Sequence, residues 1–143
     1  MKGHHPFSIL LVEDDEAARE ILTSVLAIKF PRIAFHVADN GKTGLEYFRR
    51  HSPAIVITDV NMPVMDGIRM ARGIKSIAAN VKLIVLTAFS DKTVLETTAV
   101  AGIGIDHYIL KPVDYVKLFS AIEQCLAGVA PDHARTCPAG ERR

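Results

Sequence analysis

The sequence predicts an α/β fold in which a doubly wound parallel sheet of five strands is covered by helices on both sides. Two observations support this prediction: short apolar runs recur along the chain, and an amphipathic stretch follows each of them. Strictly alternating strands and helices favour parallel strands joined by right-handed crossovers. Ligands of such sheets bind beyond the carboxyl ends of the strands, so we look for functional residues there.

The expected strands are the five apolar runs. They cover residues 7–12, 33–37, 54–58, 82–87 and 107–110. Because these runs are almost continuously apolar, we expect the strands to be buried on both faces.

The expected helices lie between and after these strands. Apolar residues recur at helical spacing at Ala18, Ile21, Leu22, Val25 and Leu26, and again at Ile68, Ala71, Ile74 and Ala78. Residues 41–50, 92–101 and 114–126 complete the set of five predicted helices.

The length of 143 residues suits one domain with its own core. We expect an N-terminal extension at residues 1–6, the domain at residues 7–128, and a flexible tail or the start of a linker at residues 129–143. This last segment has two prolines and no apolar periodicity.

The charge balance of the whole sequence gives no case for a strongly anionic partner. The 17 Lys and Arg residues against 16 Asp and Glu residues give a formal net charge of +1. This balance predicts no direct binding to nucleic acid and no binding to an anionic membrane.

The cysteines and the N-terminal residues indicate a cytoplasmic location. Cys125 and Cys137 cannot form a disulfide framework, which suits a reducing compartment. The first apolar run ends in four acidic residues, Glu13 to Glu16, and such a pattern is neither a signal peptide nor a membrane span.

Four of the predicted strands are followed by chemically reactive side chains. Glu13 and Asp14 follow the first strand, Asp59 the third, Thr87 the fourth and Lys111 the fifth. A doubly wound sheet brings these positions to one edge. Three carboxylates in one small pocket need a neutralising cation, and oxygen ligands of this kind favour Mg²⁺.

Lys111 and Thr87 add groups that suit a phosphoryl ligand. The ammonium of Lys111 can pair with a carboxylate or a phosphoryl oxygen, and the hydroxyl of Thr87 can hydrogen-bond another such oxygen. An aspartate beside them is a plausible nucleophile toward phosphorus, which would form an acyl phosphate.

Four segments resemble the signature segments of the two-component receiver family. They are Val-Glu-Asp-Asp at 12–15, Asp-Val-Asn-Met-Pro-Val-Met-Asp-Gly at 59–67, Leu-Thr-Ala at 86–88 and Tyr-Ile-Leu-Lys-Pro at 108–112. The similarity covers about residues 7–128, and the segment that begins at Asp59 is the most specific of the four. The resemblance implies a flavodoxin-like fold with strand order 2-1-3-4-5.

The resemblance also assigns roles by position. It implies that Asp59 accepts a phosphoryl group from a phosphohistidine on a sensor kinase or a histidine phosphotransfer domain. Asp14 and Asp59 would ligate Mg²⁺ through their side chains, Asn61 through its backbone carbonyl, and Glu13 mainly through metal-bound water.

The remaining roles concern the response to phosphorylation. Thr87 and Lys111 would hold phosphoryl oxygens, and Tyr108 would be an aromatic switch whose rotamer follows Thr87. The face formed by the fourth helix, fifth strand and fifth helix would dock an output domain or a second copy. The family also has a cis peptide bond before the proline at position 112.

One spacing departs from the family. Thr87 and Lys111 are 24 positions apart, slightly more than is usual. We expect the surplus at residues 101–105, where Gly102 and Gly104 allow an accommodating loop.

Structural explanations compete for individual residues. Asp14 or Asp15 could cap the first helix, and Asp66 with Gly67 is interpreted as the cap and entry turn of the third. Tyr108 could simply pack at a strand end.

Other functions also remain open. The chain could be a receiver segment of a hybrid histidine kinase or of a multidomain regulator, or a degenerate receiver that only binds partners. An aspartyl-phosphate phosphohydrolase is less favoured, because it would ordinarily place a second aspartate where this chain has Asn61. We expect a signalling module with its own phosphorylation and dephosphorylation chemistry rather than a turnover enzyme.

Overall fold

The computed structural model describes residues 7–88 and 102–135, and the side chains up to residue 128. Five strands form one sheet, and every pairing is parallel. They are β1 (Ser8–Val12), β2 (Ala34–Ala38), β3 (Ile55–Asp59), β4 (Lys82–Thr87) and β5 (His107–Leu110). The observed order β2-β1-β3-β4-β5 confirms the predicted topology.

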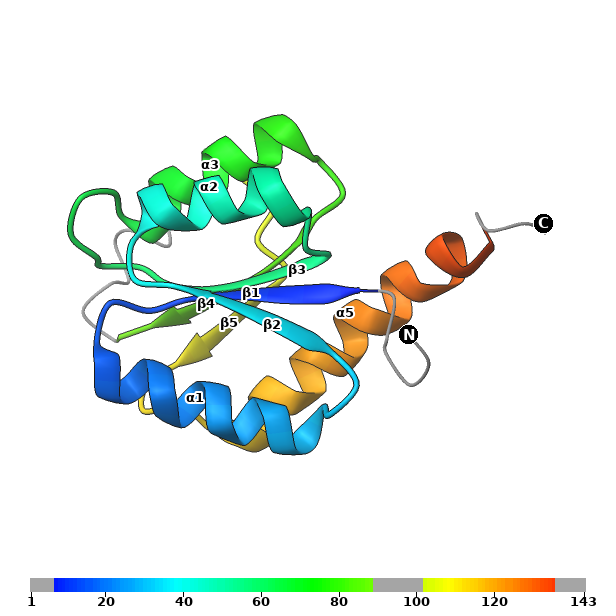
Figure 1. Ribbon diagram of the computed structural model, residues 1–143, viewed down its shortest axis with the longest axis horizontal. Helices are drawn as coiled ribbons and strands as arrows, with labels where there is room; N and C mark the ends of the chain where they lie inside the picture. The colour runs from blue at the N-terminus through cyan, green and yellow to red at the C-terminus, as the bar shows by residue number, and fades with distance from the viewer. Residues whose placement is uncertain (1–6, 89–101, 136–143) are drawn as a thin grey trace.

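Helices cover both faces of the sheet (Figure 1). They are α1 (Glu16–Lys29) and α5 (Tyr115–Arg135) on one face, and α2 (Gly41–His51) and α3 (Gly67–Ile77) on the other. The helix predicted at residues 92–101 lies outside the described residues.

Three of these helices begin at a polar side chain that accepts a hydrogen bond from a backbone N–H of the first turn. The capping residues are Asp15, Asn40 and Asp66. These bonds are 2.8–2.9 Å long and satisfy donors that a helix leaves unpaired at its start. Of the two candidates for the first cap, Asp14 and Asp15, it is Asp15 that caps α1, and the capping role predicted for Asp66 is confirmed.

The sheet separates two hydrophobic clusters. On one face, Leu26 of α1 and Leu118 of α5 pack against inward-pointing residues of the strands. On the other, Phe48 of α2 and Met70 of α3 do the same. The alternation of strand side chains assigns neighbouring residues to opposite clusters.

The expectation of burial on both faces is correct for the three central strands and wrong for the two edge strands. In β3 all five residues are buried. In β2, Ala34 and Val37 are exposed, and in β5, Tyr108 and Leu110 are exposed. An edge strand has only one neighbouring strand, and the helices on the two faces of the sheet cover it incompletely.

The end of the last helix also differs from the prediction. Helix α5 continues to Arg135, whereas the sequence led us to expect a tail from residue 129. Proline lacks one N–H donor, and the helix continues past Pro131 despite this loss. Within the described residues, no helix combines the length and apolar character needed to cross a bilayer.

Candidate metal centre

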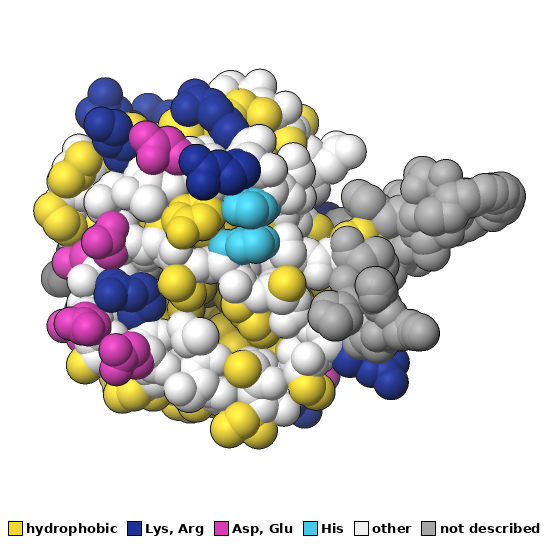
Figure 2. Space-filling model, in the orientation of Figure 1, with side chains coloured by type: hydrophobic (Ala, Val, Ile, Leu, Met, Phe, Trp, Pro, Cys, Tyr) yellow, Lys and Arg dark blue, Asp and Glu magenta, His cyan; other side chains and the backbone are white. Residues whose placement is uncertain are grey.

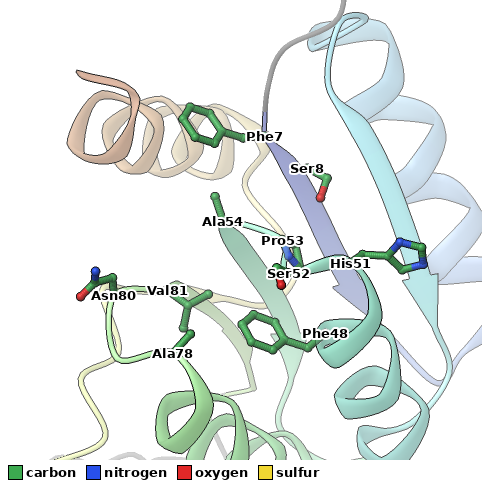
Figure 3. A pocket seen from close by; sticks show the side chains of 10 residues that line it. All are labelled: Phe7, Ser8, Phe48, His51, Ser52, Pro53, Ala54, Ala78, Asn80 and Val81. Atoms are coloured by element: carbon green, nitrogen blue, oxygen red, sulfur yellow. The ribbon is translucent and has the colours of Figure 1, made fainter. Parts of the chain in front are cut away.

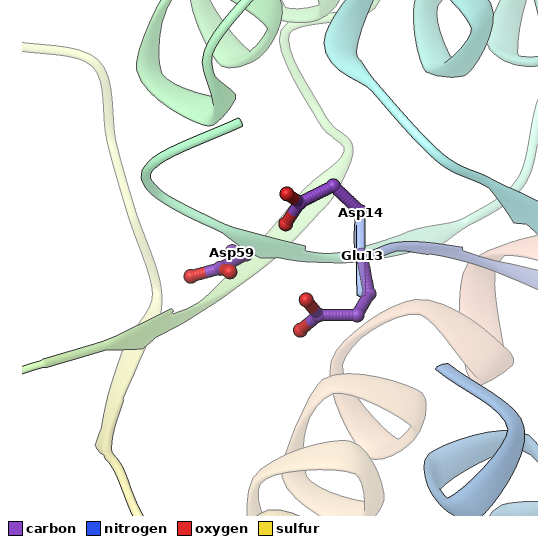
Figure 4. A group of neighbouring side chains, drawn as sticks. All are labelled: Glu13, Asp14 and Asp59. Carbon is purple, nitrogen blue, oxygen red and sulfur yellow. The ribbon is translucent and has the colours of Figure 1, made fainter. Parts of the chain in front are cut away.

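Three carboxylates converge where β1 and β3 end. Strands β1 and β3 pair in register with Val12 opposite Thr58, so the residues that follow, Glu13 and Asp59, become neighbours. Carboxylate oxygens of Glu13, Asp14 and Asp59 all lie within 4.8 Å of one another. Figure 4 shows the three side chains directed into a common space. The predicted acidic cluster is therefore present.

Lys111 supplies the positive charge of this site. Its Nζ lies 2.9 Å from Asp59 Oδ2 and 3.6 Å from Glu13 Oε1. The backbone N–H of Lys111 donates to the carbonyl oxygen of Thr87 at 2.8 Å, which anchors the residue just after β5. Burial acts to lower the pKa of Lys111, but the bond to Asp59 and the charges of Asp59 and Glu13 outweigh it and raise the pKa. The peptide bond to Pro112 is cis, as the resemblance implied.

Among the described acids Glu13 is the most deeply buried, with only 2% of its surface exposed. Its Oε2 accepts a hydrogen bond from the backbone N–H of Asp15 at 3.1 Å, while Oε1 has no hydrogen-bond partner among the described residues. Burial raises the pKa of Glu13, and the negative charges of Asp59 and Asp14 add to this effect. The Asp15 N–H and Lys111 act in the opposite direction. Besides its ion pair with Lys111 at 3.6 Å, this buried oxygen lies close to other acids, an environment that favours an added cation.

Asp59 is held from several sides. It is 8% exposed, and its Oδ1 accepts a hydrogen bond from the backbone N–H of Val60 at 2.8 Å. Its carbonyl oxygen accepts from the hydroxyl of Thr58 at 2.8 Å. Its other oxygen, Oδ2, is paired with Lys111.

Gly67 is a supporting residue whose role the sequence analysis did not find. Its N–H donates to the carbonyl oxygen of Val60, and a Cβ atom at this position would lie 2.0 Å from the carbonyl oxygen of Asp59. Only a residue without a side chain allows this approach. The signal available in the sequence was the glycine itself, which we interpreted as part of a helix entry turn.

The remaining site residues lie around this cluster. Thr87 ends β4 and is 2% exposed, and its hydroxyl donates to the carbonyl oxygen of Ala88 at 3.2 Å. Asn61 is exposed in the loop after β3. Tyr108 pairs with Val85 within β5 and β4 and is 43% exposed. Glu13, Asp14, Asp59 and Lys111 therefore form the site, with Thr87 at the same sheet edge.

The residues present fit a magnesium ion. Carboxylate oxygens are the hard ligands that Mg²⁺ binds, and the ion usually uses only one or two carboxylates and keeps several waters. Asp14 and Asp59 would hold the ion, with Glu13 beside them, and the charge of the ion would relieve the repulsion within the cluster.

The loop before β5 contains the two glycines to which we assigned the surplus residues. Gly102 and Gly104 have φ angles of +70° and +83°, a region that favours glycine. Between them Ile103 is 7% exposed and belongs to the core cluster under α3. The loop is therefore anchored by one buried side chain between two glycine turns.

A cavity of about 330 Å³ lies at the opposite end of the sheet, where β1 begins and where the chain enters β3 and β4 (Figure 3). Buried Phe48 and Val81 contribute to its lining. It lies away from the carboxyl ends of the strands, where ligands of open α/β sheets bind.

Comparison with known proteins identifies the family. The family model described as "Response regulator receiver domain" matches residues 9–123. The chain belongs to the response-regulator receiver family. The receiver domain is 34% identical over 126 residues to Response regulator MprA of Mycobacterium leprae, covering 88% of this chain and 54% of the relative. It thus spans about half the length of that relative.

Solved structures share the fold. The N-terminal domain of an uncharacterized protein from Wolinella succinogenes has a TM-score of 0.79 and 31% identity, covering 88% of this chain and 98% of that chain. A signal receiver domain of a histidine kinase from Syntrophus aciditrophicus has a TM-score of 0.75 and 30% identity, with 86% and 92% covered. This family belongs to two-component signalling systems.

Proposed function

We propose that the receiver domain accepts a phosphoryl group on Asp59 from a phosphohistidine of a sensor histidine kinase or a histidine phosphotransfer domain. The observation that supports this most directly is the position of Asp59 between two kinds of partner. Lys111 lies 2.9 Å from one of its oxygens, and the carboxylates of Glu13 and Asp14 complete a cluster suited to Mg²⁺. A nucleophile beside a cation and a metal site is the arrangement that phosphoryl transfer requires.

The transfer exchanges one bond to phosphorus for another. A carboxylate oxygen of Asp59 attacks the phosphorus atom, and the P–N bond to the donor imidazole breaks. The electron pair of that bond returns to the imidazole nitrogen, which is protonated from solvent, and Asp59 becomes an acyl phosphate. Bound Mg²⁺ would supply the positive charge that neutralises the phosphoryl oxygens.

Lys111 and Thr87 then act on the product. The Lys111 ammonium, which pairs with the Asp59 carboxylate in this structure, would bind a phosphoryl oxygen instead. The Thr87 hydroxyl, which donates to the carbonyl oxygen of Ala88, would turn to donate to another phosphoryl oxygen. We propose that this movement allows Tyr108, now 43% exposed, to change rotamer. The face that includes β5 and α5 would then bind an output domain or a second copy.

The cellular context is part of the same proposal. We place the domain in the cytoplasm, within a multidomain regulator or a hybrid histidine kinase. The match covers only 54% of the mycobacterial response regulator, which supports a multidomain regulator. The likeness to the receiver domain of a histidine kinase supports a hybrid kinase. A phosphohydrolase is disfavoured because position 61 is Asn rather than a second aspartate.

The acceptor is tested by labelling with acetyl phosphate in the presence of Mg²⁺, followed by mass spectrometry of the intact protein. Asp59→Asn should abolish labelling. The matched control is Asp66→Asn, which changes an exposed carboxylate in the same loop and keeps a residue able to cap α3. Full labelling of the Asp59 variant, or loss in both variants, would refute the assignment.

The metal site is tested by titrating Mg²⁺ into the isothermal calorimeter. Asp14→Ala should weaken binding by more than about tenfold, since even an outer partner of a metal ligand commonly contributes that much. Asp15→Asn is the control, because Asp15 is the neighbouring acid and caps α1 instead. Equal affinity in wild type and Asp14→Ala would rule out the proposed ligand.

A further inference from the structure

The outer surface of α2 and α3 is strongly basic. We call this surface the basic face, and its residues are Lys42, Arg49, Arg50, Arg69 and Arg72, all exposed. Glu46 is the only acidic residue in either helix. Figure 2 shows Lys and Arg side chains gathered over this upper part of the molecule with an acidic side chain among them.

Close packing of the two helices makes the basic face continuous. A Cβ atom on Gly44 would lie 2.6 Å from Met70 Sδ, and one on Gly73 would lie 3.2 Å from Leu45 Cδ2. Glycine at these positions lets α2 and α3 approach each other closely. The cations of both helices therefore project from one surface.

Among the described residues, no acidic side chain forms an ion pair with these cations. Within the part of the chain that the structure describes, the only ion pairs are those of Lys111 with Glu13 and Asp59. Helices α2 and α3 together hold six of the 17 basic residues and one of the 16 acidic ones, so the rest of the chain is net acidic. The balanced net charge of the sequence hides this separation. Clustered like charges repel one another, and an anionic partner would remove that cost.

A row of flat rings borders the basic face. His36 of β2 lies against His51 at a centroid distance of 4.1 Å and an interplanar angle of 13°, and Tyr47 lies 5.7 Å from His51. Tyr47 and His51 belong to the last turns of α2, next to Arg49 and Arg50. None of the three rings is fully buried, and Figure 2 shows two histidines together on the surface beside a basic side chain.

Cations next to partly exposed, nearly parallel rings match the chemistry of one class of partner. Single-stranded nucleic acids bind where basic side chains follow the phosphates and rings stack on the bases. Four of the five cations are arginines, which form two-pronged hydrogen bonds with phosphate. An anionic membrane would need apolar side chains to insert, and Ile77 is the only large exposed hydrophobic residue in α2 and α3.

We propose that the basic face binds single-stranded nucleic acid, with phosphates on the arginines and bases against the rings of Tyr47, His36 and His51. This site is separate from the acidic cluster and does not require phosphorylation of Asp59. Affinity should come mainly from counterion release, without strong sequence preference.

Fluorescence anisotropy with a labelled single strand of roughly 16 nucleotides tests the proposal. Wild-type protein should bind, and the logarithm of affinity should fall against the logarithm of salt with a slope of about −3, from four or five neutralised phosphates. The double variant Arg49→Glu with Arg72→Glu should lose more than about tenfold in affinity. The control is Arg32→Glu with Lys117→Glu, which changes two exposed cations outside α2 and α3 and alters the net charge equally.

His51→Ala separates stacking from charge. It should weaken binding about tenfold while leaving the salt slope unchanged, because it removes a ring and no phosphate contact. Circular dichroism melts would show that all variants remain folded.

The proposal would be overturned if the wild-type protein did not bind the oligonucleotide at low salt. It would also be overturned if the two double variants lost affinity for the oligonucleotide equally. Binding to phosphatidylglycerol vesicles without binding to the oligonucleotide would assign the face to membranes instead. An unchanged affinity of His51→Ala would overturn the stacking contact.

Discussion

Gly67→Ala tests how tightly the fold supports the acceptor. The added Cβ would lie 2.0 Å from the Asp59 carbonyl oxygen and 2.9 Å from Thr58 Oγ1, whereas real Cβ atoms essentially never approach within 3.0 Å. The oxygen belongs to the backbone of Asp59, so rotation of a side chain cannot relieve the overlap. Either β3 or the start of α3 must therefore move by about 1 Å. Overpacking of this kind costs about 3 kcal/mol.

Alanine is a better helix former than glycine by about 1 kcal/mol, which offsets part of the cost of the overlap. Gly67→Ala should therefore lower the free energy of unfolding by about 2 kcal/mol in all. Two further glycines provide reference values for this prediction. At Gly102, φ is +70° with no atom within 4 Å, so Gly102→Ala measures conformational strain alone, about 1 kcal/mol. At Gly73 the new Cβ meets only the side chain of Leu45, and Gly73→Ala should be nearly neutral.

Urea unfolding followed by circular dichroism gives these three values on one scale. Magnesium titration of Gly67→Ala adds a functional measurement, because a displaced Asp59 should also bind the ion more weakly. The reasoning would be refuted if Gly67→Ala kept the stability and the magnesium affinity of the wild type while Gly102→Ala lost measurable stability. The close approach at Asp59 would then impose no constraint.

Three other changes probe separate features. Val64 is 72% exposed at a φ of +68°, so Val64→Gly should raise stability by about 1 kcal/mol in urea unfolding, and a loss would contradict the inferred strain. Burial, with a smaller contribution from Asp106, raises the pKa of Cys125 to about 11. In a Cys137→Ser background this thiol should react with iodoacetamide at pH 8 far faster in urea than in buffer, and equal rates would refute its protection. Burial and the charge of His51 lower the pKa of His36 below its usual 6.5, so the unfolded chain binds that proton more readily. Stability from this residue is complete above about pH 6.5 and decreases as the pH falls through the folded-state pKa. Melting temperatures should therefore fall less between pH 7 and 5 in His36→Gln than in wild type, and identical curves would exclude the effect.

The strands and the acidic cluster were predictable because both depend on local patterns. The apolar runs fixed the strand positions to within a residue, and the bounds of β4 and β5 agree fully. Glu13, Asp59 and Lys111 were found because parallel topology places successive strand ends together.

Features that depend on neighbours were not predictable in this way. The exposure of Ala34 and Tyr108 follows from the edge positions of β2 and β5, which apolar content does not reveal. The contact of Gly67 with Asp59 depends on where the loop returns after β3. The basic face arises from side chains of two helices, so a net charge summed over the sequence cannot show it. The continuation of α5 past Pro131 contradicts a local rule for helix ends.

The division of the interior by the sheet has a consequence for sequence change. The two hydrophobic clusters have no member in common, because neighbouring residues of each strand serve opposite sides. A volume change at Leu26 or Leu118 on one side therefore acts on a different set of buried side chains from the set that surrounds Phe48 or Met70 on the other. Substitutions on opposite sides should be nearly additive in stability. Surfaces built on α1 and α5 can diverge to fit new partners while the layer of α2 and α3 keeps its own packing.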